Sequence, residues 1–147
     1  MSAAAPPPER RFLDTNVLVY AFDNAEPGKQ ALARELLAGG GTFVLSAQVL
    51  GEFFVTVTRK LAEPLSIDRA REAIAALEPV PVEPITAPLV TAAIARVHRS
   101  RLSYWDALIV ETCRAADCGI LLTEDLQDGQ LIDGVRVRDP FARADVT

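Results

Sequence analysis

The chain has 147 residues, which fits one domain, and half of them are hydrophobic, so a sizeable core is expected. Its formal net charge of −5 argues against a generally basic coat for nucleic acid, although a local basic groove stays compatible with it. One histidine and two cysteines exclude a four-ligand Cys/His zinc site within one chain. They indicate reduced thiols and a cytoplasmic location.

The first segment, residues 1–10, reads MSAAAPPPER and is predicted to be a flexible leader because of its small residues and prolines. It lacks the basic start and apolar stretch of a signal peptide. No apolar run approaches the roughly 20 residues that a membrane helix needs. Residues 11–147 are expected to form a single domain.

Strand-type and helix-type patterns alternate along the rest of the chain. Ser46, Ser66, Thr86 and Ser103 are the expected helix caps, and the glycines at 39–41 are expected to end a helix. The alternation predicts a three-layer α/β/α domain with a mostly parallel central sheet. In chain order we predict a strand at 10–14, helices at 16–23 and 27–41, a strand at 42–46, helices at 47–61 and 66–78, an edge strand or loop at 79–86, helices at 86–101 and 104–117, a strand at 119–125, a loop at 126–134 and a strand at 135–140.

Two aspartates end predicted strands. Asp14 interrupts an apolar run, FLDTNVLVY, and Asp125 follows the buried-type strand GILLTED. The carboxyl ends of strands in an open α/β sheet form the edge at which ligands bind. The alternative for each aspartate is a turn or cap residue, a common role for this side chain.

Glu52 lies in VLGEFFVTV, where apolar neighbours cover most of a helix surface. A glutamate there must reach the rim of the helix or meet a cation. The alternative is a narrow solvated stripe through Glu52, Thr56 and Lys60 at helical spacing. Because Lys60 is too far along the helix to contact Glu52, the stripe would leave the glutamate unpaired.

Asp106 lies in SYWDALIV, at the start of a helix whose other residues are mostly apolar. Ser103 and Asp106 together resemble a capping box, and an acid in the first turn is favoured by the helix dipole. The competing interpretation is a carboxylate brought to a buried site by a buried helix.

The four acids come from four separate elements, as in an active site that forms only on folding. A calcium loop would instead place its oxygen ligands within about a dozen consecutive residues. Clustered carboxylates repel one another unless a cation is present. Oxygen-only ligands favour Mg²⁺ or Mn²⁺ over zinc.

The segments FLDTNVLVY, LGEFF, LSYWDALIVETCRAADC and LLTEDLQDGQ, followed by VRDPF, resemble PIN-domain ribonucleases, most of all the VapC-type toxins of VapBC toxin–antitoxin pairs. The resemblance spans residues 11–141 and implies a PIN-like fold. It implies that the matching acids, Asp14, Glu52, Asp106 and Asp125, are catalytic and hold one or two Mg²⁺ or Mn²⁺ ions. Thr15, Asn16 and Thr123 match polar residues that line such a site, and Asp128 is a further candidate.

The activity that the resemblance implies is metal-dependent hydrolysis of RNA by an endoribonuclease, leaving 5′-phosphate and 3′-hydroxyl ends. It also implies a separate antitoxin chain of the VapB type and a homodimer. A basic run before the Asp106 helix, with Arg96, Arg99 and Arg101, could guide the RNA backbone toward the site. The alternative for this run is a solvated helix end.

Three other functions stay open at this point. The chain could be a phosphoesterase acting on small esters, a ribonuclease that is not a toxin, or a binding module without chemistry. The presence of all four motif acids counts against the last of these.

Overall fold

The computed structural model describes residues 9–142. Most of the predicted leader, residues 1–8, lies outside this range, and Arg10 already belongs to the first strand. Strands and helices alternate along the described chain as the sequence predicted. In order they are β1 (Arg10–Leu13), α1 (Thr15–Tyr20), α2 (Pro27–Ala38), β2 (Thr42–Ser46), α3 (Ala47–Arg59), α4 (Ile67–Ala75), β3 (Val82–Glu83), α5 (Ala87–Arg99), α6 (Tyr104–Ala115), β4 (Ile120–Leu122), β5 (Leu131–Ile132) and β6 (Val135–Arg138).

The strands form one sheet in the order β3-β2-β1-β4-β6-β5. All neighbouring strands run parallel except β5 and β6, which form an antiparallel pair. This confirms the predicted mostly parallel sheet. The proline-rich segment 79–86 contributes only the short edge strand β3, because proline cannot donate to a central ladder. The predicted loop at 126–134 was wrong at Leu131–Ile132, which pair with β6.

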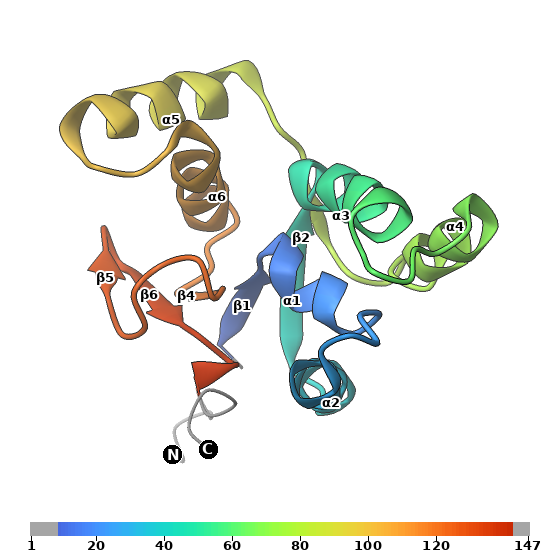
Figure 1. Cartoon of the computed structure of the whole chain (residues 1–147). Coiled ribbons are helices and arrows are strands. Elements are labelled where there is room, and N and C mark those ends of the chain that lie inside the picture. Colours follow the sequence, from blue (N-terminus) through green and yellow to red (C-terminus); the bar gives the residue numbers. More distant parts are fainter. Residues whose placement is uncertain (1–8, 143–147) are drawn as a thin grey trace, which may run out of the picture.

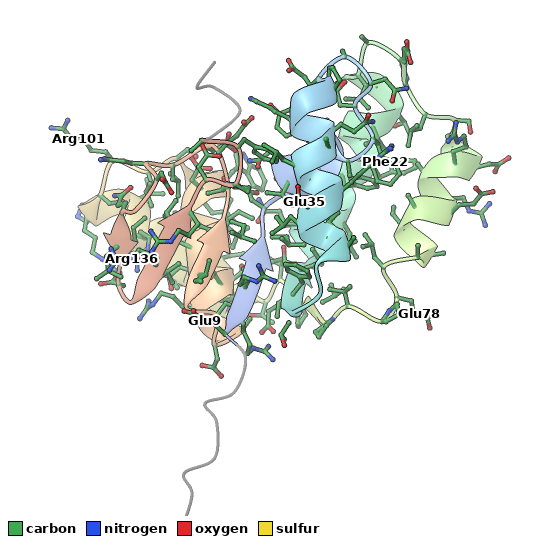
Figure 2. All side chains as sticks on the ribbon, turned by 90° about the horizontal axis from the view of Figure 1, so that it is seen from below. Glu9, Phe22, Glu35, Glu78, Arg101 and Arg136 are labelled. Atoms are coloured by element: carbon green, nitrogen blue, oxygen red, sulfur yellow. The ribbon has the colours of Figure 1, made fainter. Side chains whose placement is uncertain are left out.

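Helices cover the sheet on both sides, as a three-layer α/β/α fold requires. In Figure 1, α5 and α6 pack against each other on one side, whereas α2 lies on the other. Seen from below, α2 lies in front of β2 and beside β1, and α4 forms the outer edge (Figure 2). Phe12, Leu121 and Val137 lie in register across β1, β4 and β6 and are fully buried. None of the helices in residues 9–142 is long and apolar enough to cross a membrane.

The helix boundaries follow the capping residues in the sequence. Each predicted cap accepts a hydrogen bond from the backbone N–H three residues later, which satisfies a donor at the helix start. Glycines end α2, since Gly40 and Gly41 have φ values of 77° and 109°. The four caps and their donors are Ser46 with Val49, Ser66 with Arg69, Thr86 with Leu89, and Ser103 with Asp106.

The carboxyl ends of β1 and β4 lie side by side. Leu13 and Leu122 are partners in the parallel ladder, and the backbone N–H of Asp14 donates to the Leu122 carbonyl at 3.0 Å. Thr123, the first residue after β4, donates its backbone N–H to the Arg138 carbonyl. This pairing places Asp14 and Thr123 at the same edge of the sheet.

Candidate active site

Asp14 is held from two sides at the junction of β1 and α1. Only 6% of the residue is exposed. Its Oδ1 accepts a 2.7 Å hydrogen bond from the backbone N–H of Thr15 and caps α1, and its Oδ2 accepts one of 2.8 Å from the Thr123 hydroxyl. The capping interpretation is therefore correct for Oδ1 of Asp14. Its Oδ2 instead belongs to a hydrogen-bonded network that connects the ends of β1 and β4.

Thr123 and Asn16 connect Asp14 to Asp125. The Thr123 hydroxyl accepts from the Asn16 amide at 3.2 Å and from the backbone N–H of Asp125 at 3.0 Å. The Asn16 amide also donates to Asp125 Oδ2 at 3.1 Å. Asp125 is exposed, so these contacts fix the orientation of a carboxylate that faces solvent. Asp14 and Asp125, which are far apart in sequence, thus share a single hydrogen-bonded network.

Glu52 points from α3 toward the same network. Its Oε2 accepts a 2.7 Å hydrogen bond from the Thr15 hydroxyl, and its Oε1 accepts one of 2.8 Å from the Gln48 amide. The structure thus gives Glu52 partners that the solvated-stripe alternative did not supply. Gln48 was missed, although its position one turn before Glu52 could have indicated the contact. The contact with Thr15 depends on the packing of α1 against α3.

Asp106 lies in the first turn of α6 and is half-buried. Ser103 accepts a hydrogen bond from its backbone N–H, which is one half of a capping box. The reciprocal bond is missing, since the Asp106 carboxylate has no hydrogen bond or ion pair with residues 9–142. Its charge nevertheless contributes to raising the pKa of Asp125, so the two carboxylates interact.

Neighbouring carboxylates contribute to the raised pKa values of Asp14 and Asp125. Burial raises the pKa of Asp14 to about 6, against the opposing effect of its hydrogen bonds with Thr123 and Thr15, and the charges of Asp125 and Glu52 add to the rise. Partial desolvation of its carboxylate likewise raises the pKa of Asp125, although the residue as a whole is exposed, and the hydrogen bond with Asn16 opposes this rise. Within residues 9–142 no lysine or arginine forms an ion pair with any of the four acids. The site therefore holds uncompensated negative charge.

The donor set fits a divalent cation by chemistry. The side chains are carboxylates with hydroxyl and amide neighbours, and oxygen ligands of this kind suit Mg²⁺ or Mn²⁺. In the present arrangement no three His, Cys, Asp or Glu side chains of residues 9–142 come close enough to hold one ion together. Like charges favour separation when no cation is present, so shared ligation requires these side chains to rotate inward.

A second polar cluster holds the segment that carries Asp125. Glu124 accepts a 2.5 Å hydrogen bond from the Tyr20 hydroxyl and forms a 3.0 Å ion pair with Lys29 of α2. The backbone N–H of Glu124 donates to Asn16 at 3.4 Å. Sequence reasoning missed this cluster because its members come from α1, α2 and the segment after β4.

Asp128 and Arg96 lie apart from the proposed site. Asp128 accepts a 2.9 Å hydrogen bond from the backbone N–H of Asp139 and lines a groove beside α2. Arg96 is only 4% exposed, which contradicts the expectation that it faces RNA. Its guanidinium pairs with Glu111 at 2.7 Å and Asp133 at 2.5 Å, so its charge is used inside the fold. We leave both residues out of the proposed site.

The two other arginines of the basic run are accessible. Arg99 is exposed and lies 3.9 Å from Asp133, at the limit of an ion pair. Figure 2 shows Arg101 extending from the edge of the molecule into solvent. These two side chains are therefore available for a phosphate backbone.

Solved structures with the same fold include toxin–antitoxin proteins. A toxin–antitoxin complex from Klebsiella pneumoniae is 21% identical, covers 88% of this chain and 97% of its own, and has a TM-score of 0.67. VapC20 of Mycobacterium tuberculosis, a sarcin-ricin loop cleaving toxin, is 25% identical over 76% of this chain and 86% of its own, with a TM-score of 0.59. VapBC2 from Rickettsia felis, bound to a DNA fragment from its promoter, is 18% identical, covers 88% of this chain and 97% of its own, and has a TM-score of 0.61.

The sequence itself was also compared with known families. No curated protein matches the chain. The family model of the PIN domain matches residues 11–127, which include Asp14, Glu52, Asp106 and Asp125. This match spans most of the chain. The chain therefore belongs to the PIN-domain family.

Proposed function

We propose that this protein is a Mg²⁺- or Mn²⁺-dependent endoribonuclease and the toxin of a toxin–antitoxin pair. The observation that carries the proposal is the buried Asp14, whose pKa is raised to about 6 beside other carboxylates with which no lysine or arginine of the described chain forms an ion pair. Buried like charges are costly, and clusters of perturbed carboxylates mark functional sites. A divalent cation would relieve this cost.

Each acid has a defined part in the proposed site. Asp14, Glu52, Asp106 and Asp125 would hold one or two ions, which would supply an activated water and stabilise the departing oxygen when bound. Thr123 fixes the inner oxygen of Asp14. Thr15 fixes Glu52, and Asn16 orients Asp125. Such supporting hydrogen bonds keep ligand side chains in a productive orientation.

The proposed substrate is RNA, and the proposed partner is a separate antitoxin chain. Support comes from the described activity of VapC20 and from relatives solved as toxin–antitoxin complexes. An antitoxin would lay a helix or an extended tail over the acidic site, and a basic side chain in that tail would take the place of the cation. We also expect a homodimer and a cytoplasmic location.

The experiment is a cleavage assay on purified protein with structured and single-stranded RNA. We expect cleavage with Mg²⁺ or Mn²⁺, no cleavage in EDTA, and products with 5′-phosphate ends. Full activity in EDTA, or products with 2′,3′-cyclic phosphates, would exclude the metal mechanism. A chromogenic phosphodiester serves as the comparison substrate, since faster turnover of it than of RNA would favour a small-ester phosphoesterase.

The toxin role has its own test. Expression in bacteria should arrest growth, and co-expression of the protein encoded by the neighbouring reading frame should relieve the arrest. The Asp14→Asn variant is the matched control, because it removes a proposed ligand while keeping a side chain that can still cap α1. Normal growth despite abundant, soluble, RNA-cleaving protein would identify a ribonuclease that is not a toxin.

A further inference from the structure

A hollow of about 380 Å³ borders the acidic site between α3 and the start of α6. Its volume lies within the range of about 300–1,000 Å³ typical of small-ligand pockets. Its lining combines an aromatic side chain, a proposed catalytic carboxylate and a cationic side chain. The lining residues are Gly51, Glu52, Val55, Thr56, Lys60 and Trp105.

Trp105 is the aromatic wall of this hollow. It is the only tryptophan of the chain, and 60% of the residue is exposed. The Tyr104 ring meets it edge-on, with centroids 5.0 Å apart, and Tyr104 itself packs against Ala93, Ala107 and Leu108. The indole is thus supported from behind, while much of its surface is open to solvent. It also lies directly beside Asp106 in the chain.

Lys60 supplies a positive charge to the lining of the hollow. The residue is exposed, and its ammonium forms no ion pair or hydrogen bond with the described part of the chain. Gly51 also lines the hollow, and a Cβ added there would meet nothing within 4 Å, so the space beside it is open. The hollow thus offers, beside the acidic site, an aromatic ring and a cation that is unpaired within residues 9–142. A ligand that carries both an aromatic group and a negative charge fits this surface better than a purely apolar side chain does.

We propose that this hollow binds a nucleobase of single-stranded RNA next to the cleaved phosphodiester, with the base stacked on Trp105 and a neighbouring phosphate held by Lys60. This inference rests on the proposed ribonuclease function and adds a substrate subsite to it. Aromatic side chains that stack on unpaired bases, combined with cations that contact the backbone, are the general means of binding single strands. A protein segment is the competing occupant, and it would not require the lone cation.

The single tryptophan gives a direct readout of stacking. Fluorescence excited at a wavelength that tyrosine does not absorb reports on Trp105 alone, so adding a short single-stranded RNA of mixed sequence should quench it along a saturating curve. Ca²⁺ replaces Mg²⁺ in this titration, and a gel run afterwards verifies that the RNA is intact. Heparin is the control polyanion, and it should leave the fluorescence nearly unchanged because it carries no bases.

Variants separate the base contact from the phosphate contact. By fluorescence anisotropy of a labelled RNA, Trp105→Ala should weaken binding about tenfold or more, and Trp105→Phe should restore part of the loss. Removing single bases from the RNA should weaken wild-type binding strongly at one position, and Trp105→Ala should abolish that difference. Ile67→Ala, which truncates a similarly exposed apolar residue on α4, should bind like wild type.

Lys60→Ala should reduce the slope of log affinity against log salt by about 0.7, the value for one phosphate contact on a single strand. Arg71→Ala is its control, since Arg71 is an exposed cation on α4 away from the hollow. If wild type cuts RNA while Trp105→Ala binds it equally well and RNA causes no quenching, the subsite is wrong and the ribonuclease function stands. If wild type neither binds nor cuts any RNA, the ribonuclease function fails, and the subsite fails with it.

Discussion

The Thr15 hydroxyl donates a 2.7 Å hydrogen bond to Glu52 and joins the first turn of α1 to the middle of α3. The same residue donates its backbone N–H to Asp14. One threonine therefore fixes two proposed metal ligands that come from different elements. The Gln48 amide holds the other Glu52 oxygen, so the glutamate would remain partly oriented without the threonine hydroxyl.

Thr15→Val removes this hydroxyl and leaves the backbone bond to Asp14. We expect Mn²⁺ affinity and RNA cleavage to fall by about 10- to 100-fold, the usual effect of losing a residue that orients a ligand. Thr112→Val is the matched control, because Thr112 is also buried and donates its hydroxyl to a carbonyl within α6. The control should lose stability and keep its metal affinity. Equal metal affinity for both variants would show that Thr15 has no positioning role.

Asp14 predicts a pH dependence of stability in the metal-free protein. Its pKa of about 6 in the folded state exceeds the ordinary value of 3.8, so folding favours the protonated form. Its stabilising contribution is fully present below the ordinary pKa and is lost as the pH rises through about 6. The expected loss from pH 4 to pH 7 is about 2 kcal/mol of unfolding free energy, out of about 3 kcal/mol over the whole titration. Asp14→Asn should remove this part of the pH dependence, measured by urea unfolding in EDTA.

Metal binding should show the complementary trend. The ligand form of Asp14 is the ionised one, so Mn²⁺ affinity of the wild type should increase as the pH rises through about 6 and then level off. Isothermal titration calorimetry at several pH values measures this directly. An affinity that does not change between about pH 5 and pH 7 would exclude Asp14 as a ligand.

Lys29→Met tests the cluster that holds the Asp125 segment. The Lys29 and Glu124 side chains are 20% and 22% exposed, so the ion pair is partly protected from solvent. We expect a loss of about 1 kcal/mol in unfolding free energy and a weaker Mn²⁺ affinity, because Asp125 loses support. Arg71→Met, which removes an exposed pair with Asp68 at 4.0 Å, should change neither quantity. If Lys29→Met loses stability while its Mn²⁺ affinity is unchanged, the Lys29–Glu124 pair does not support the metal site.

Helix starts and strand ends could be predicted because their signals are local. Ser46 and Ser103 precede apolar helical patterns, and Asp14 follows a short apolar strand. The two residues of β5 were missed because they lie in a loop-like sequence, and their strand conformation depends on β6. Local patterns do not record such pairing.

The burial of Arg96 did leave a signal in the sequence. Ala93 and Arg96 are three residues apart on α5, and both are buried against α6, so Arg96 follows the helical spacing of the apolar face. The basic residues around it concealed this. Its partners Glu111 and Asp133 come from α6 and from the turn after β5, and no local pattern connects them.

The arginines of α5 and the following loop should differ sharply on mutation. Arg96→Met leaves Glu111 buried without its main partner, so we expect a loss of about 3 kcal/mol in unfolding free energy, which Arg114 at 3.1 Å partly limits. Arg99→Ala and Arg101→Ala should leave the unfolding free energy unchanged. Each should reduce the slope of log RNA affinity against log salt concentration by about 0.7. Urea unfolding and anisotropy titrations at several salt concentrations measure these effects. Unchanged salt dependence in both alanine variants would remove this run from the RNA path.

Asp106→Asn separates the two interpretations of Asp106. If the residue acts only as a first-turn acid, the loss of its charge should cost about 0.3–1 kcal/mol through the helix dipole, with or without metal. The missing reciprocal capping bond and the effect of Asp106 on the pKa of Asp125 favour a shared acidic site instead. Removing one of several like charges should then stabilise the metal-free protein.

We therefore expect Asp106→Asn to melt at a higher temperature than wild type in EDTA. Its melting temperature should rise less on addition of Mn²⁺, and the variant should lose RNA cleavage. The pKa of Asp125, followed by NMR, should also fall in the variant, because its carboxylate loses a repulsive neighbour. Thermal melting of both proteins in EDTA and through a Mn²⁺ titration provides the comparison. A variant that is less stable in EDTA, gains as much from Mn²⁺ as wild type and still cuts RNA would show that Asp106 serves the helix alone.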